Sequence, residues 1–215
     1  MEKRRFKFWL TAVLILIISG AIMTKLGGGL NTANLPLVDS LSPSDWTQGN
    51  KEAKVILIEY SDFQCPGCAA FSKTLDDIVK EFGNHIILAY RHFPLKDIHK
   101  NAEPAAWAAE AAGVQGKFWE MHDKLFTYQN TWSGQVNPEI TFQKFATDLG
   151  LDMGKFNTDY NSRTIRKNVD LDLASAEKNK LDHTPTIFLN GKQLDNPRNY
   201  DEFRTLVREA IQNNS

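Results

Sequence analysis

The chain has 215 residues, with 25 Lys and Arg against 26 Asp and Glu, and a formal net charge of −1 at pH 7. Five of the basic residues but only one acidic residue precede position 26, so the rest of the chain is mildly acidic. The absence of a basic stripe in that part argues against binding to nucleic acid. Its length suffices for one well-buried core, with room for an inserted subdomain.

A basic segment over residues 3–7 precedes an apolar run over residues 8–23. As a helix this run rises roughly 24 Å, slightly less than a full hydrocarbon core. Positive charge before the run predicts a single-pass signal anchor over residues 1–25, with the remainder of the chain extracytoplasmic. The alternative is a cleaved signal peptide, because Ser19-Gly20-Ala21 is an acceptable small-x-small site. A buried core helix fits poorly with the basic flank.

Residues 26–50 have no apolar period and predict a linker. Residues 55–58 form a short continuous apolar run, which is typical of a buried strand. Apolar residues at i, i+3, i+4 and i+7 over 75–82 predict a helix, and the apolar run 86–90 predicts a second strand. Strand, helix and strand in this order indicate a right-handed βαβ unit with a parallel strand pair.

Residues 98–180 show helical apolar spacing, punctuated by helix start and stop signals, and are predicted to be wholly helical. Five aromatic residues of this segment have the spacing of buried helix faces, which favours core packing over a substrate groove. They are Trp107, Phe118, Trp119, Phe126 and Trp132.

After the helical segment, residues 186–189 predict a strand, and Asn190-Gly191 is a strong signal for a hairpin turn into a returning strand. Residues 203–211 predict a last amphipathic helix. The predicted fold is therefore α/β. One domain comprises residues 51–97 and 181–215, and the helical segment is inserted between its two parts.

The only two cysteines, Cys65 and Cys68, lie where the first strand runs into the first helix. A disulfide between them would close a very short loop and would therefore stabilise the fold little. Because disulfides persist outside the cytoplasm, a redox-reactive pair is the better interpretation. A helix N-terminus favours a thiolate, which predicts that Cys65 is the exposed nucleophile and Cys68 the shielded resolving thiol. Pro66 suits the first helical turn, and Gly67 removes bulk beside the pair.

The same two cysteines could also form half of a zinc site, which needs two further ligands, usually at regular spacing. The histidines show no such spacing, and we expect neither a metal nor a cofactor. The histidines are His85, His92, His99, His122 and His183.

Two further sites in the sequence are candidates for a role beside the cysteine pair: Glu59 and Thr184-Pro185. Glu59 ends the first strand, where burial would raise its pKa and let it relay a proton to or from Cys68. The alternative is a strand-end glutamate that points at water. Thr184-Pro185 directly precedes a predicted strand, where a proline marks an edge or a turn.

Three separated motifs together resemble the DsbA-like thiol–disulfide oxidoreductases: EYSDFQCPGC at 59–68, YRHFP at 90–94 and TPTIFLNG at 184–191. The resemblance covers roughly residues 45–213. It implies a thioredoxin fold with an inserted helical domain, and disulfide exchange with exported proteins and a redox partner.

Carried over residue by residue, the resemblance makes Cys65 the nucleophile, Cys68 the resolving cysteine and Glu59 the buried acid. It makes Pro185 a cis-proline whose loop faces the pair and offers the backbone of Thr184 to a peptide substrate. Two positions depart from the family pattern. Gly67 replaces the histidine of the best-known oxidases, and His183 replaces the usual glycine before Thr184-Pro185. Pro66, Gly67 and His183 are therefore candidate modulators of the pair.

The leading hypothesis is a membrane-tethered, monomeric dithiol oxidase that donates its disulfide to exported proteins and is served by a membrane redox partner. A thiol–disulfide reductase or isomerase is the second hypothesis. A copper chaperone on the same fold is the third, in which Cys65, Cys68 and a distant histidine would be the ligands.

Overall fold

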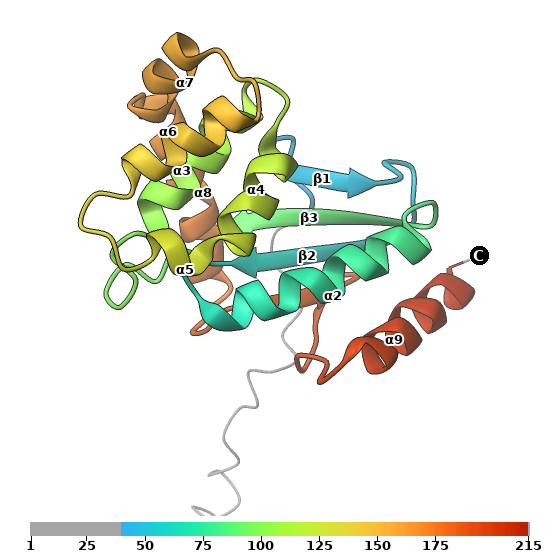
Figure 1. Cartoon of the computed structure of the whole chain (residues 1–215). Helices are drawn as coiled ribbons and strands as arrows, with labels where there is room; N and C mark the ends of the chain where they lie inside the picture. The colour runs from blue at the N-terminus through green and yellow to red at the C-terminus, as the bar shows by residue number, and fades with distance from the viewer. Residues whose placement is uncertain (1–39, 215) are drawn as a thin grey trace, which may run out of the picture. The chain divides into compact units, whose positions relative to one another are not determined.

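The computed structural model describes residues 40–214. Its strands form one mixed sheet in the order β1-β3-β2-β4-β5 (Figure 1). Only β2 and β3 of these neighbours run parallel, and the other pairs are antiparallel. The strands are β1 (Trp46–Gly49), β2 (Val55–Ser61), β3 (Ile86–His92), β4 (Thr186–Leu189) and β5 (Lys192–Gln193).

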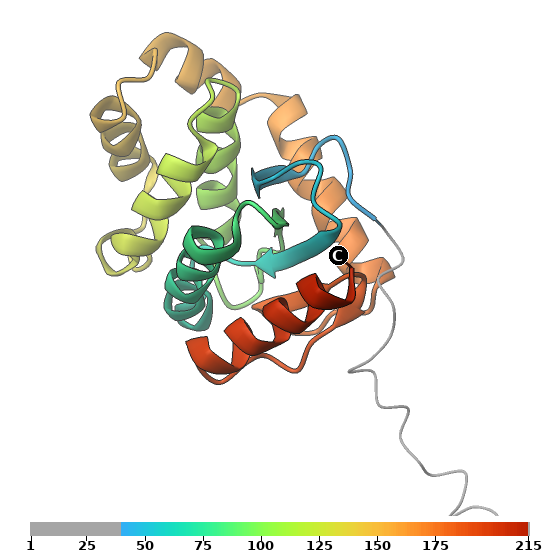
Figure 2. The same ribbon diagram turned by 90° about the vertical axis from the view of Figure 1, so that its right-hand side faces the viewer.

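Helices cover both faces of the sheet because its two central strands, β2 and β3, are buried along almost their whole length. On one face, Leu57 of β2 packs with residues of α2 (Pro66–Phe82) and α9 (Tyr200–Asn213). On the other face, Ile58 packs with residues of α8 (Arg163–Lys178). Figure 2 shows the ribbons of α2 and α8 on opposite sides of the strands. The alternation of side chains along β2 thus supplies two separate cores.

A helical insertion separates β3 from β4, as the sequence predicted. Its helices are α3 (Ala102–Gly113), α4 (Phe118–Thr127), α5 (Gln129–Trp132), α6 (Glu139–Asp148), α7 (Met153–Tyr160) and α8. The preference for core packing of its aromatic residues is confirmed, since Phe118, Phe126 and Trp132 are buried and Trp107 and Trp119 pack against them in part. The result is a thioredoxin-like α/β fold with an inserted helical domain.

The linker prediction was wrong for residues 46–49. These residues form β1, which pairs with β3 at the edge of the sheet. This short strand forms although its sequence has no apolar run, because the side chain of Trp46 anchors it. Its indole stacks on Phe118 at 4.7 Å and donates a hydrogen bond to Glu110. The strand is therefore held by the insertion, a contact that local sequence does not reveal.

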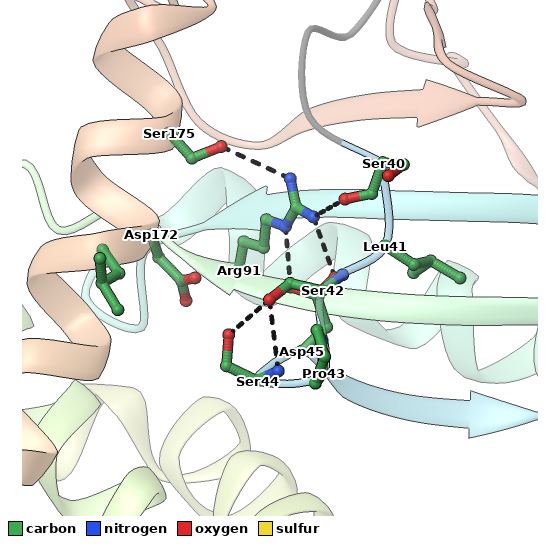
Figure 3. A pocket seen from close by; sticks show the side chains of 10 residues that line it. Ser40, Leu41, Ser42, Pro43, Ser44, Asp45, Arg91, Asp172 and Ser175 are labelled. Atoms are coloured by element: carbon green, nitrogen blue, oxygen red, sulfur yellow. Dashed lines mark hydrogen bonds and ion pairs between the residues drawn. The ribbon is translucent and has the colours of Figure 1, made fainter.

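Buried charges hold the segment before β1 to the sheet. Arg91 of β3 forms a two-pronged ion pair with Asp45, with N–O distances of 2.8 and 2.9 Å, and both side chains are almost fully buried. The guanidinium also donates to the carbonyl of Ser40 and to the hydroxyl of Tyr60. This cluster borders a pocket of about 460 Å³, shown in Figure 3, which lies on the α8 face.

The predicted signal anchor, residues 1–25, and residues 26–39 of the predicted linker lie outside the described residues. Within residues 40–214, no helix is both long and apolar enough to cross a membrane.

A test of the β1 contact follows from Gly113, the last residue of α3. A Cβ atom at this position would lie 2.4 Å from the Trp46 ring. Better helix propensity would favour Gly113→Ala by about 1 kcal/mol, but displacing a packed indole costs about 1–3 kcal/mol. We expect a net loss of stability in urea unfolding. Gly134→Ala is the control, because a Cβ there meets nothing within 4 Å; equal stabilities of the two variants would contradict the role of Trp46.

Candidate active site

The cysteine pair lies at the start of α2, directly after the end of β2. Cys65 is the N-cap residue, with extended backbone angles, and Pro66 follows as the first helical residue. Proline fits there because the N–H that it lacks has no partner inside a helix. Cys65 is partly exposed, Cys68 is fully buried, and both are free thiols. The positions match those that the sequence predicted.

The two thiols have opposite pKa shifts. A hydrogen bond from Cys68, together with the Thr184 side chain and the backbone N–H groups of Gly67 and Cys68, lowers the pKa of Cys65 to about 5 against an opposing effect of burial. Burial raises the pKa of Cys68 far above its ordinary value, and the nearby thiol of Cys65 and charge of Glu59 add to the rise. Near neutral pH the pair therefore holds one proton, on Cys68.

The loop before β4 faces the pair. The Thr184–Pro185 peptide bond is cis, as the family resemblance implied. The protonated thiol of Cys65 donates to the carbonyl oxygen of Thr184 at 3.6 Å. A Cβ atom on Gly67 would lie 3.6 Å from Cys65 Sγ and 3.7 Å from Pro185 Cδ, so any side chain at this position would contact both. Gly67 therefore leaves the surface between the thiol and the proline open.

Glu59 is buried, with 1% of its surface exposed, and does not point at water. It lies in the central strand β2, opposite Tyr90 of β3 and Ile187 of β4. Burial raises the pKa of Glu59 to about 7, against the opposing effects of His122 and Ser61. A carboxyl group with that pKa gains and loses a proton near neutral pH.

His183 does not contribute a visible contact to the pair. Its imidazole is 55% exposed and forms a 2.7 Å hydrogen bond with Asp182, its neighbour in the chain. The groups that lower the pKa of Cys65 are Cys68, Thr184 and backbone N–H groups. A modulating role for His183 stays a prediction.

Sequence reasoning missed the role of Asp62, although this residue belongs to the first motif. Its buried carboxylate accepts from the backbone N–H of Gln64 at 2.6 Å and of Leu95 at 2.8 Å, and hydrogen-bonds with His99 at 2.8 Å. Its own backbone N–H donates to Cys68 Sγ at 3.5 Å. Asp62 thus joins the loop before Cys65 to the loop after β3. The signal that could have indicated Asp62 was its position, directly after the first strand and three residues before Cys65.

Gln129 of α5 holds the same loop from the insertion, and no local pattern indicated it. Its side-chain amide donates to the carbonyl of Phe63 at 2.7 Å and of Cys65 at 3.0 Å. Gln64 adds a second link, since its amide donates to the carbonyl of Ser133 at 2.9 Å. The insertion therefore fixes the backbone on which Cys65 stands.

Over residues 40–214, no group of three or more His, Cys, Asp or Glu side chains is placed to hold a metal ion. What the site can do chemically rests on the two thiols and the buried acid. A stabilised thiolate next to a buried thiol, at a helix N-terminus and facing a cis-proline, defines a thiol–disulfide oxidoreductase.

Comparison with known proteins agrees with this class. The sequence model of a family described as Thioredoxin matches residues 41–209. The fold is similar to that of BdbD from Bacillus subtilis, with a TM-score of 0.69, 24% identity, and coverage of 79% of this chain and 94% of that chain. It is also similar to α-DsbA1 from Wolbachia pipientis, with a TM-score of 0.71, 18% identity, and coverage of 80% and 94%. The chain therefore belongs to the thioredoxin family.

The chain also matches curated proteins that are named Na⁺/H⁺ antiporters. One is Na⁺/H⁺ antiporter NhaA 1 of Mycolicibacterium gilvum, 36% identical over 168 residues, which are 76% of this chain and 26% of that protein. Another is Na⁺/H⁺ antiporter NhaA of Herminiimonas arsenicoxydans, 36% identical over 169 residues, which are 77% and 26%. The chain spans about a quarter of the length of these relatives, so the likeness does not extend their named transport activity to it.

The raised pKa of Glu59 predicts a pH-dependent stability. Between its ordinary value of 4.5 and the folded value of about 7, the native state keeps a proton that the unfolded chain has lost. Stability therefore falls as pH rises through this window, by on the order of 3 kcal/mol for this group. Glu59→Gln removes that loss, so we expect the reduced variant to exceed the wild type at about pH 8 and to equal it near pH 4.5.

Urea unfolding of the reduced proteins at both pH values measures this difference. Glu52→Gln is the matched control, because Glu52 is exposed and should leave the stability unchanged at both values. An advantage of Glu59→Gln that is equally large at both pH values would contradict the burial argument.

Proposed function

We propose that the protein is an extracytoplasmic dithiol oxidase, which donates the Cys65–Cys68 disulfide to thiols of exported proteins. The observation that carries this proposal is the stabilised thiolate of Cys65, with its pKa lowered to about 5. A group that stabilises the thiolate stabilises the reduced pair, and a pair that is more stable when reduced is a stronger oxidant.

The reaction balances in two exchanges. A substrate thiolate attacks Cys65 Sγ of the disulfide, and Cys68 leaves as a thiolate that takes a proton from Glu59. A second thiolate of the substrate then attacks the sulfur of the first substrate cysteine in the mixed disulfide, and Cys65 leaves as a stable thiolate. Two electrons pass from the substrate to the pair, and the substrate gains a disulfide. Glu59 serves as the proton donor because its pKa of about 7 suits both proton states.

The size of the pKa shift gives an expected reduction potential. Thioredoxin, with a nucleophile pKa of about 7, has a potential near −270 mV, and DsbA, at about 3.5, has one near −120 mV. One pKa unit is about 1.4 kcal/mol, or about 30 mV for a two-electron couple. A pKa of about 5 therefore places this pair at roughly −210 to −165 mV.

That range also contains the potential of protein disulfide isomerase, about −180 mV, so isomerisation is the second candidate function. We assign the oxidase role to a monomeric protein, because the stabilised thiolate of Cys65 favours the donation of a disulfide. The basic and apolar N-terminal pattern supports a membrane anchor over residues 1–25 and a membrane redox partner that re-oxidises the pair.

The first experiment equilibrates the domain with glutathione buffers and measures the potential of the Cys65–Cys68 pair. We expect a value of roughly −210 to −165 mV. A value near −270 mV would make the protein a reductase and overturn the oxidase proposal. A second readout separates oxidase from isomerase. An oxidase forms disulfides in a reduced substrate protein, whereas an isomerase repairs a scrambled one.

The roles of the two cysteines are tested separately. Cys68→Ser should accumulate mixed disulfides between Cys65 and substrate, because the resolving thiol is gone. Cys65→Ser should neither exchange nor trap substrate. Non-reducing electrophoresis with mass spectrometry detects the adducts. Adducts on Cys68 in the Cys65→Ser protein, or wild-type turnover without adducts in Cys68→Ser, would reverse the assignment.

A further inference from the structure

Behind Cys68 lie four buried polar atoms that have no hydrogen-bond partner among residues 40–214. They are Glu59 Oε1, Ser61 Oγ, Tyr90 Oη and His122 Nε2. An isolated buried polar atom costs free energy, and native proteins satisfy clusters of such atoms with internal water. Four of them in one place indicate a polar site inside the core.

The strand register brings these groups together. Glu59 and Ser61 are two residues apart on β2 and therefore share a face, and Glu59 lies directly opposite Tyr90 on β3. The ring of Tyr90 meets that of His122 edge-on, with centroids 5.3 Å apart. His122 also lowers the pKa of Glu59, in keeping with an imidazole that lies close to the carboxyl group.

His122 connects this interior site to the surface. Its Nδ1 atom hydrogen-bonds with Asp123 at 2.9 Å, and Asp123 is 59% exposed, whereas the His122 side chain is only 4% exposed. Its Nε2 atom, on the other side of the ring, is buried and has no partner among the described residues. Phe63 and Phe126 pack against the ring at 5.7 and 4.9 Å and hold it in place.

We propose that His122 is the outlet through which Glu59 and Cys68 exchange a proton with solvent, with water bridging the interior polar atoms and Asp123 receiving the proton outside. This inference rests on the proposed function, because it extends the proton relay of Glu59. It assigns a positioning and proton-exchange role to a residue of the insertion.

The proton transfers balance over the catalytic cycle. When Cys68 leaves as a thiolate, Glu59 gives it a proton. Neutral His122, with its proton on Nε2, then takes a proton on Nδ1 from the Asp123 side and gives the Nε2 proton to Glu59, which leaves the ring neutral with its proton on Nδ1. When the pair is re-oxidised, Cys68 loses its proton and every transfer runs in reverse. The second half-reaction returns the imidazole to its first tautomer, so no ring flip is needed.

Titratable groups face His122 from each neighbouring element. Glu59 approaches from β2, Tyr90 from β3, and Asp123 from α4 itself. Asp76 of α2 acts on both Glu59 and His122, and burial raises its own pKa. Asp123 is the exposed member of this set and lies at the surface end of the path, where a proton must be collected.

The test separates attack from resolution. Reduced protein is mixed with glutathione disulfide, and acid-quenched samples are weighed by mass spectrometry. Attack by Cys65 forms the mixed disulfide without needing a proton from Cys68, whereas resolution requires Cys68 to lose its proton. In His122→Phe, which fits the aromatic surroundings, we expect attack at the wild-type rate and resolution slowed about tenfold. His85→Gln is the control, because His85 is exposed and lies with Lys54 at the opposite end of the strands from Cys65.

A second readout does not depend on activity. Carboxyl ¹³C NMR of reduced protein should show a higher pKa for Glu59 in His122→Phe, because the imidazole that lowers this pKa has been removed. An unchanged pKa, or resolution at the wild-type rate, would overturn the outlet. Equal slowing of attack and resolution would also overturn it, since this would mark a structural role.

If His122→Phe does not fold, Asp123→Asn tests the proposed proton path instead. This exposed variant keeps a hydrogen-bond acceptor but cannot take up a proton, so resolution should slow, and an unchanged rate would reject the outlet. Glu59→Gln distinguishes the two proposals. If it resolves at the wild-type rate, the relay itself fails; if it is slow while the His122 and Asp123 variants are not, only the outlet fails.

Discussion

The N-terminus of α2 is the physical feature on which the site depends. Backbone N–H groups of Gly67 and Cys68 point at Cys65 Sγ, and the first turn of a helix carries partial positive charge. That arrangement works only if Cys65 stands at the cap, and it does so because β2 ends a few residues earlier at the centre of the sheet. The sheet, the helix start and the reactive thiol are thus one unit.

The asymmetry of the two thiols follows from depth in the molecule. Cys65 is partly exposed at the cap, and Cys68, one turn into the helix, is fully buried. Desolvation opposes the thiolate of Cys68 and also opposes the carboxylate of Glu59 beneath it. Both groups therefore favour their neutral forms, as the proposed proton relay between them requires.

The helical insertion does more than cover one end of the sheet. Through Gln129 it holds the carbonyl groups of the loop before Cys65, and through Phe118 and Glu110 it holds Trp46 and so the edge strand β1. It also brings an aromatic cluster and a histidine against the face of β2 that carries Glu59. Residues far apart in the chain thereby set the geometry of a four-residue motif.

The sequence by itself determined the strands 55–58, 86–90 and 186–189, the helical insertion and the reactive pair, because apolar period and helix punctuation are local signals. It also indicated Glu59, since a carboxyl group at the end of a buried strand is expected to be buried and to have a raised pKa. Only the tertiary structure decided that residues 46–49 form a strand, that Asp62 and Gln129 hold the active loop, and that His122 lies beside Glu59. These depend on pairs of residues 64 or more positions apart for Trp46 and Gln129, which leave no periodic trace in a single sequence.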